Sequence, residues 1–220
     1  MKSTTISILF ATCLPSVISA ASISLTNIGA NGISDALIIT RANSSTPASG
    51  GIAAAGYFGT LSDAQVLTLS ADLGNIATLI ADFQVVTSTT LDSVVAGGGL
   101  FNLDNGSVVL PNATRAGSGL YSFLGNGSNL LSSTAWILWD NIAIVDAEDS
   151  VASPDSNTLL MAQEGVALIS GGLTTAVVDF SAIGGAANTQ TPGIRLAAVP
   201  EPSAFIISAL GVLGLLRRKR

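Results

Sequence analysis

Residues 135–145, with the sequence AWILWDNIAIV, form the longest predicted strand in this 220-residue chain. Similar runs rich in Ile, Val, Leu and Thr recur along the chain and are interrupted by Gly, Asn, Asp and Ser, a pattern typical of short strands joined by turns. The predicted strands are Ser22–Asn27, Ala36–Arg41, Ile52–Phe58, Gly99–Leu103, Val108–Leu110, Gly119–Leu124, Ala135–Val145, Thr158–Ala162, Gly165–Ser170 and Ala176–Phe180. The sequence therefore predicts a mainly β domain that is antiparallel and sandwich-like.

Turn residues between these runs predict where strands reverse direction. The stretch 103–108, with the sequence LDNGSV, contains Asn105-Gly106. An Asn-Gly pair between apolar runs is a strong signal for a two-residue hairpin turn, because both residues tolerate positive φ. We expect a hairpin here and further turns at 126–127 and 163–165.

One segment carries helical signals. Ser62 is suited to cap a helix, with Gln65 three residues later and Leu61 placed to pack against Val66. The following apolar residues recur at spacings that place them on one helical face: Leu73, Ile76, Ile80 and Phe83. Gly74 weakens this pattern by about 1 kcal/mol relative to Ala. We expect one or two short helices within 62–85, packed against the β domain.

The N-terminus has the three parts of a secretion signal. A positive charge at Lys2 is followed by an apolar run over 6–14 and then by a zone of small residues. The small residues that suit cleavage are Ser19, Ala20 and Ala21. We expect residues 1–21 to form a helical signal peptide that is recognised by the secretion translocon and removed after Ala20 or Ala21.

A short motif, an apolar run and a basic cluster end the chain. The motif Val199-Pro200-Glu201-Pro202 precedes an apolar run over 204–216. A helix of that length spans roughly 20 Å against a hydrocarbon core of about 30 Å, which suits a transient membrane stop. The basic residues expected to stay on the cytoplasmic side are Arg217, Arg218, Lys219 and Arg220. The prolines prevent the helix from extending into the motif.

This tail resembles the PEP-CTERM sorting domain of Gram-negative bacteria, which has the same three parts in the same order over residues 199–220. The resemblance implies recognition by an exosortase, a membrane-embedded enzyme similar to cysteine transpeptidases, and removal of the tail. It also implies transient anchoring in the inner membrane through the C-terminal helix. The expected destination is the cell envelope, the cell surface or the extracellular space, often in bacteria that make exopolysaccharide.

Between the two ends, residues 22–180 are expected to form an extracellular β-rich domain. Residues 181–198 contain Gly184-Gly185 and Pro192, and we expect a flexible linker there. From 21 to 199, three arginines stand against thirteen acidic residues, a net charge of −10. An acidic surface repels phosphate backbones, so nucleic acid is not an expected partner.

The middle domain lacks the residue types on which most enzymes depend. The chain has no His, its lysines are Lys2 and Lys219, and its single Cys, Cys13, lies in the signal peptide. Catalytic triads, Cys–His pairs, Ser–Lys dyads and imidazole or thiolate zinc sites are therefore excluded. A carboxylate pair of the glycosidase type stays open, with the candidates Asp140, Asp146, Glu148, Asp149, Asp155 and Glu164.

Calcium binding is a further alternative, because residues 102–107 and 146–149 carry the oxygen ligands that calcium prefers. Neither stretch fits an EF-hand loop. Turns and solvated acidic loops are the preferred interpretation of these residues. We predict no catalytic site, no cofactor and no metal.

Trp136 and Trp139 suggest stacking on sugar rings, but three positions apart in a strand they point to opposite faces. Burial in the core is the preferred interpretation, because tryptophan buries a large apolar area. The favoured hypothesis is a non-catalytic surface or matrix protein. The alternatives are a carbohydrate-binding module of the exopolysaccharide layer and a carboxylate-dependent enzyme that acts on polysaccharide.

Overall fold

The computed structural model describes residues 21–29, 31–108, 118–144, 156–161 and 165–199. The strands are β1 (Ala21–Thr26), β2 (Ile38–Thr40), β3 (Ile52–Phe58), β4 (Phe83–Thr90), β5 (Asn102–Val108), β6 (Gly119–Gly125), β7 (Ala135–Ile144), β8 (Ser156–Leu160), β9 (Val166–Ile169), β10 (Leu173–Val178), β11 (Thr189–Arg195) and β12 (Ala197–Ala198). The helices are α1 (Asp63–Ser70) and α2 (Ile76–Asp82), with short 3-10 turns at η1 (Ile33–Asp35), η2 (Leu73–Asn75) and η4 (Ser181–Ile183). The prediction of a mainly β fold with two short helices is confirmed.

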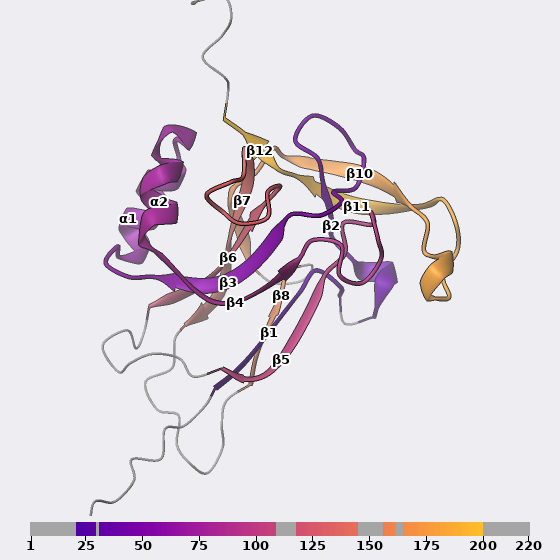
Figure 1. The fold of residues 1–220 in the computed structure, drawn as a ribbon, viewed down its shortest axis with the longest axis horizontal. Coiled ribbons are helices and arrows are strands. Elements are labelled where there is room, and N and C mark those ends of the chain that lie inside the picture. Colours follow the sequence, from indigo (N-terminus) through magenta and orange to yellow (C-terminus); the bar gives the residue numbers. More distant parts are fainter. Residues whose placement is uncertain (1–20, 30, 109–117, 145–155, 162–164, 200–220) are drawn as a thin grey trace, which may run out of the picture.

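A six-stranded sheet forms the middle of the molecule (Figure 1). Its main path runs β12-β7-β6-β3-β4, and β9 also pairs with β7. Every pairing in this sheet is antiparallel. Strand β3 lies between two neighbours and is buried along almost its whole length, which explains its near-continuous run of small and apolar residues.

The two helices cover one face of this sheet, on the left in Figure 1. Helix α1 begins with the predicted capping box, because the Ser62 hydroxyl accepts from the Gln65 amide while the Gln65 side chain accepts from the Ser62 amide at 2.8 Å. Beneath the helices, three pairs of aromatic rings meet edge to face at centroid distances of 5.0–5.4 Å. The rings belong to Phe58, Phe83, Tyr121 and Phe123.

Two three-stranded sheets contribute to the core on the opposite face of the large sheet, with the orders β5-β1-β8 and β10-β11-β2. Both contain one parallel pairing, β1 with β8 and β11 with β2, so the fold is mostly rather than wholly antiparallel. Buried side chains from all three sheets form the core between these layers, among them Leu25, Ile137 and Ile194. This layering fits the predicted sandwich-like arrangement.

A buried asparagine joins several of these segments. Asn27 is fully buried at the end of β1. Its side-chain nitrogen donates to the carbonyl oxygens of Leu37 (2.9 Å) and Gly99 (2.8 Å), and its side-chain oxygen accepts from the amide of Phe101 (2.8 Å). The side chain thus supplies hydrogen-bond partners to backbone groups of two segments that are remote from each other in the sequence, one at Leu37 and one at 99–101.

The predicted hairpin at Asn105-Gly106 is wrong. Strand β5 continues through both residues and pairs with β1, where Ile23 faces Asn105 and Ala21 faces Val108. Three steps along β5 therefore match two steps along β1, which marks a β-bulge. A glycine inside a strand often marks a bulge, and Gly106 marks a bulge in β5 and not a turn between two strands.

The predicted flexible linker over 181–198 is also wrong. Strand β11 lies between β10 and β2, and β12 joins the large sheet. Pro192 and Gly193 are residue types that usually interrupt a strand. Here β2 pairs with β11 only from Gly193 onward, so the missing N–H of Pro192 removes no hydrogen bond to β2. The folded domain consequently extends to the end of β12 instead of ending at 180.

Both helices lie within the predicted range 62–85, and α2 ends at Asp82, where Phe83 begins β4. The spacing identified a real apolar surface. Ile76 and Phe83 are buried in the core under the helices, and Leu73 and Ile80 pack against it. Leu79, which was not among the residues of the predicted apolar face, is fully buried in the same core.

Candidate functional site: the junction with the sorting segment

The C-terminal strand ties the end of the domain to its core. In β12, Ala197 pairs with Trp136 and Ala198 pairs with Ala135 on β7. Val199 follows directly, is half-buried, and packs against the core under the helices. Of the predicted sorting motif, only Val199 lies within the described residues, and the next residue is Pro200. The last described residues of the domain are therefore adjacent to the predicted motif.

The N-terminal end of the domain lies far from this junction (Figure 1). Strand β1 starts at Ala21, which pairs with Val108 on β5, near the bottom of the view, whereas β12 lies at the top. Of the predicted cleavage residues, only Ala21 is described, and Ser19 and Ala20 are not. Cleavage after Ala20 would leave β1 complete, and cleavage after Ala21 would remove its first residue.

No helix in the described part of the chain is both long enough and apolar enough to span a bilayer. The predicted signal helix, the apolar run over 204–216 and the basic cluster Arg217–Arg220 all lie outside the described residues.

The two tryptophans lie on opposite faces of β7, as the strand alternation predicted. Trp136 belongs to the core under the helices and Trp139 to the core between the sheets. Their exposed fractions are 7% and 8%. Trp136 donates its indole N–H to the carbonyl oxygen of Leu130 at 3.1 Å. Both rings are used in packing, so these tryptophans do not form an exposed platform for sugars.

Of the candidate carboxylates, Asp140 is the one within the described residues. Its Oδ1 accepts from the amide of Ile142 at 2.9 Å. Asn141 and Ile142 form an insertion in β7, because Leu120 faces Ala143 while Tyr121 faces Asp140. Ile142 is exposed and has a φ of 55°, a conformation that β-branched residues rarely adopt. The Asp140 side chain thus holds a strained turn.

The remaining five candidate carboxylates, and the possible calcium ligands at 146–149, lie outside the described residues. The other stretch suggested for calcium, 102–107, lies in β5. Within the described ranges, no group of three or more His, Cys, Asp or Glu side chains is placed to hold a metal ion.

The sequence did not predict the hydrogen bond between Tyr121 and Asp63. The phenol of Tyr121 donates to Oδ1 of Asp63 at 2.8 Å, and the amide of Gly119 donates to the same oxygen at 3.1 Å. Burial raises the pKa of Tyr121, and the adjacent Asp63 carboxylate raises it further. Asp63 lies in the first turn of α1, so this contact fixes the helix to β6. The two residues are 58 positions apart and carry no local signal for pairing.

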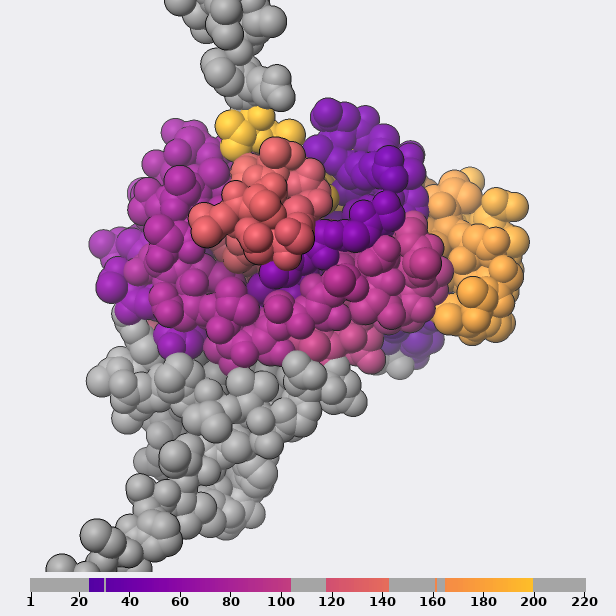
Figure 2. All heavy atoms as spheres, viewed as in Figure 1, coloured from indigo at the N-terminus to yellow at the C-terminus, as the bar shows by residue number. Residues whose placement is uncertain are grey.

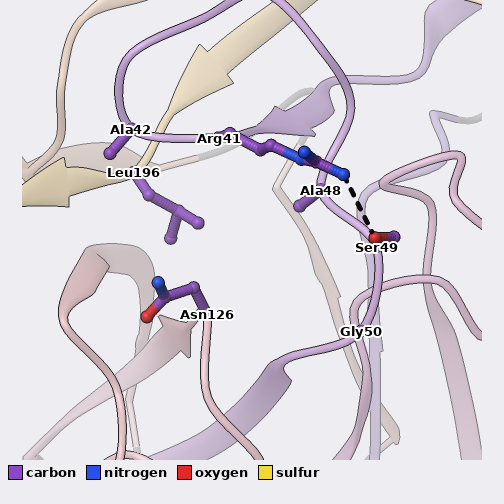
Figure 3. Close-up of a pocket in the computed structure, with 7 residues that line it drawn as sticks. All are labelled: Arg41, Ala42, Ala48, Ser49, Gly50, Asn126 and Leu196. Carbon is purple, nitrogen blue, oxygen red and sulfur yellow. Dashed lines mark hydrogen bonds between the residues drawn. The ribbon is translucent and has the colours of Figure 1, made fainter.

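Figure 3 shows a pocket of about 260 Å³ between the loop after β2 and the turn after β6. Arg41 reaches across it to the hydroxyl of Ser49 at 3.4 Å. Asn126 lines the opposite wall, where its side-chain oxygen accepts from the amides of Thr134 and Ala135. Among the described residues that line the pocket, Arg41 is the only ionisable one, so these residues supply no acid–base pair.

Comparison with known families identifies the segment at the junction. The PEP-CTERM protein-sorting motif matches residues 198–220, from the last residue of β12 onward. The motif supports export, processing by an exosortase and sorting to the cell surface. No curated protein and no solved structure matches the chain. The chain is therefore a protein with a PEP-CTERM sorting motif, which follows directly on its folded β domain.

Proposed function

We propose that this chain is an exported protein of the cell surface or extracellular matrix with a non-catalytic structural or interaction role. The observation that carries the proposal is the sorting motif, which matches residues 198–220 and begins where the folded domain ends. Before processing, the C-terminal helix holds the protein in the inner membrane. An exosortase then acts at or near the motif and releases the domain from that helix.

Within the tail, Pro200, Glu201 and Pro202 act as the recognition element for the processing enzyme. The prolines keep the backbone extended, and burying the charge of Glu201 in lipid would be costly, so the motif stays at the outer membrane surface. The basic cluster at 217–220 stays in the cytoplasm and fixes this depth. Because β12 ends at Ala198 and Val199 is half-buried, the domain leaves no long spacer between itself and the enzyme.

The non-catalytic role is supported by composition. Residues 22–199 contain no His, Lys or Cys, which removes imidazole general bases, amine nucleophiles and thiol nucleophiles. The two tryptophans that suggested carbohydrate binding are buried and do not support that function. The partners we propose are the secretion translocon, which recognises residues 1–21, and the exosortase.

The test is to express the full chain in two otherwise identical Gram-negative strains, one with an exosortase and one in which it has been deleted. We expect intact-mass analysis to show protein without residues 1–20 or 1–21 in both strains. Loss of the C-terminal tail is expected only where the exosortase is present. Equal tail removal in both strains would contradict the proposed processing, and retention of Met1–Ala20 in both would contradict a cleaved signal.

A further inference from the structure

Strand β10 forms an open edge of the β10-β11-β2 sheet, and β11 is its only partner within the described residues. In Figure 1 β10 runs along the upper right of the molecule, and the orange atoms that project on the right in Figure 2 belong to the segment that follows it. Side chains at alternate positions point outward: Leu173 is 77% exposed and Val177 is 50% exposed, with Thr175 exposed between them. Ala176 and Val178 are buried on the other face.

The backbone of the same three outward residues is directed to the open edge. The amide of Arg195 donates to the carbonyl of Gly172, in register with the β10–β11 ladder. In an antiparallel ladder, alternate residues bond to the same neighbour. Residues 172, 174 and 176 therefore face β11, whereas Leu173, Thr175 and Val177 present their N–H and C=O groups away from it.

This edge lacks the features that usually prevent pairing. Strand β10 contains no charged residue and no proline, and its register with β11 has no bulge. Four of its six residues are Thr or Val, which favour strands. The domain as a whole is acidic, with a net charge of −10 over 21–199, so two copies repel each other over most of their surface. An uncharged edge strand is where they can approach at least electrostatic cost.

We propose that β10 pairs antiparallel with β10 of a second copy of this chain, about a two-fold axis at Thr175. In that register Leu173 faces Val177 of the second copy, and Thr175 faces Thr175 of the second copy. Apolar pairs and Thr–Thr pairs at opposed positions both stabilise a sheet. The three outward residues of each copy would form about six backbone hydrogen bonds across the axis.

The sequence of β10 favours a second copy over other occupants, because its outward side chains complement themselves under the two-fold symmetry. A polysaccharide would require hydrogen-bonding side chains where β10 presents Leu173 and Val177. The contact is small, so association in dilute solution is weak. Display of many copies on one surface raises their effective concentration and favours the pairing.

The first test is disulfide trapping with the full chain purified in mild detergent. A Cys13→Ser background leaves each introduced cysteine as the single thiol. Two residues 175 across the axis have Cα atoms about 5.5 Å apart, within disulfide range, whereas two residues 173 are offset by about 14 Å. We expect oxidised Thr175→Cys to give a covalent dimer, and Leu173→Cys and Leu67→Cys to stay monomeric. No dimer with Thr175→Cys, or equal yields from all three variants, would overturn the proposal.

The second test measures association by sedimentation of the same full chain. Leu173→Lys with Val177→Lys places like charges opposite each other across the axis and should weaken self-association about tenfold or more. Leu67→Lys is the matched control, because Leu67 is 61% exposed on α1, at the other side of the molecule. Both changes leave the core intact, which circular dichroism checks. Equal association of the two variants would exclude β10 as the contact.

Discussion

Replacing Asn27 with Ala is expected to be among the most destabilising single changes in this domain. The side chain is fully buried and makes three hydrogen bonds of 2.8–2.9 Å to the backbone of Leu37, Gly99 and Phe101. In the variant the carbonyl of Leu37 and the amide of Phe101 lose this partner, whereas the carbonyl of Gly99 keeps the hydrogen bond from the amide of Ile39 at 3.1 Å. One unsatisfied buried group costs about 1–3 kcal/mol. For two such groups we expect the free energy of unfolding to fall by about 2–6 kcal/mol, a large part of the total of about 5–15 kcal/mol for a typical domain.

The assay is urea unfolding of the full chain in mild detergent, followed by tryptophan fluorescence. The only two tryptophans, Trp136 and Trp139, lie in different core layers, so the signal reports both. Asn31→Ala is the control, because the exposed Asn31 side chain bonds only to the carboxylate of Asp35, and the expected loss is below about 0.5 kcal/mol. A loss below about 1 kcal/mol for Asn27→Ala would refute the reasoning.

Asn27→Asp separates hydrogen bonding from shape. The introduced carboxyl group faces the carbonyl oxygens of Leu37 and Gly99, so its pKa in the folded state is raised above the unfolded value of about 3.9. A raised folded pKa means that the protonated form favours the folded state. The variant should therefore be most stable below about pH 4 and lose stability as the pH rises. A variant that gains stability toward pH 7 would contradict this geometry.

Three further predictions concern the helix cap, the buried phenol and a close backbone approach. Ser62→Ala should lower the free energy of unfolding by about 1 kcal/mol in the same urea assay, because the capping box at the start of α1 is lost. Burial and then Asp63 raise the pKa of Tyr121, so the protonated phenol stabilises the fold below about pH 10, and this contribution is lost as the pH rises further. The decrease in the free energy of unfolding above pH 10, measured by urea unfolding, should therefore be smaller in Tyr121→Phe. Gly165→Ala should cost more than Gly184→Ala, measured as the shift in the unfolding midpoint. Both glycines have positive φ, but only at 165 would a Cβ meet other atoms, at 2.2 Å from the indole nitrogen of Trp139.

Several elements could be predicted from the sequence because their determinants are local. Ile52–Phe58 was expected as a strand and forms β3 with the same bounds, since a strand buried between two neighbours needs a continuous apolar run. The cap at Ser62 was likewise readable, because its partner Gln65 lies three residues away. The opposite orientations of Trp136 and Trp139 follow from the two-residue period of a strand.

The errors arise where distant partners decide the structure. The local sequence Asn105-Gly106 indicates a turn, but these residues pair with β1 and form part of a bulged strand. Pro192 signals a linker, but it lies just before the pairing of β11 with β2, where a proline removes no bond between these strands. The contact between Asp63 and Tyr121 spans 58 positions, and neither residue indicates the other in the sequence. Such features depend on sheet order, which local patterns do not specify.

The mass of the exported chain after substitution of Glu201 tests the central claim most directly. The full chain and its Glu201→Ala variant are expressed in an exosortase-containing Gram-negative strain, with Glu164→Ala as a control for loss of a glutamate elsewhere. We expect the wild type and the control to lose the C-terminal tail and leave the inner membrane. The Glu201→Ala chain should keep residues 200–220 and stay in the inner membrane, with the tryptophan fluorescence of a folded domain. Removal of the tail from Glu201→Ala at the wild-type rate would contradict the account, and the tail would then act as a plain anchor.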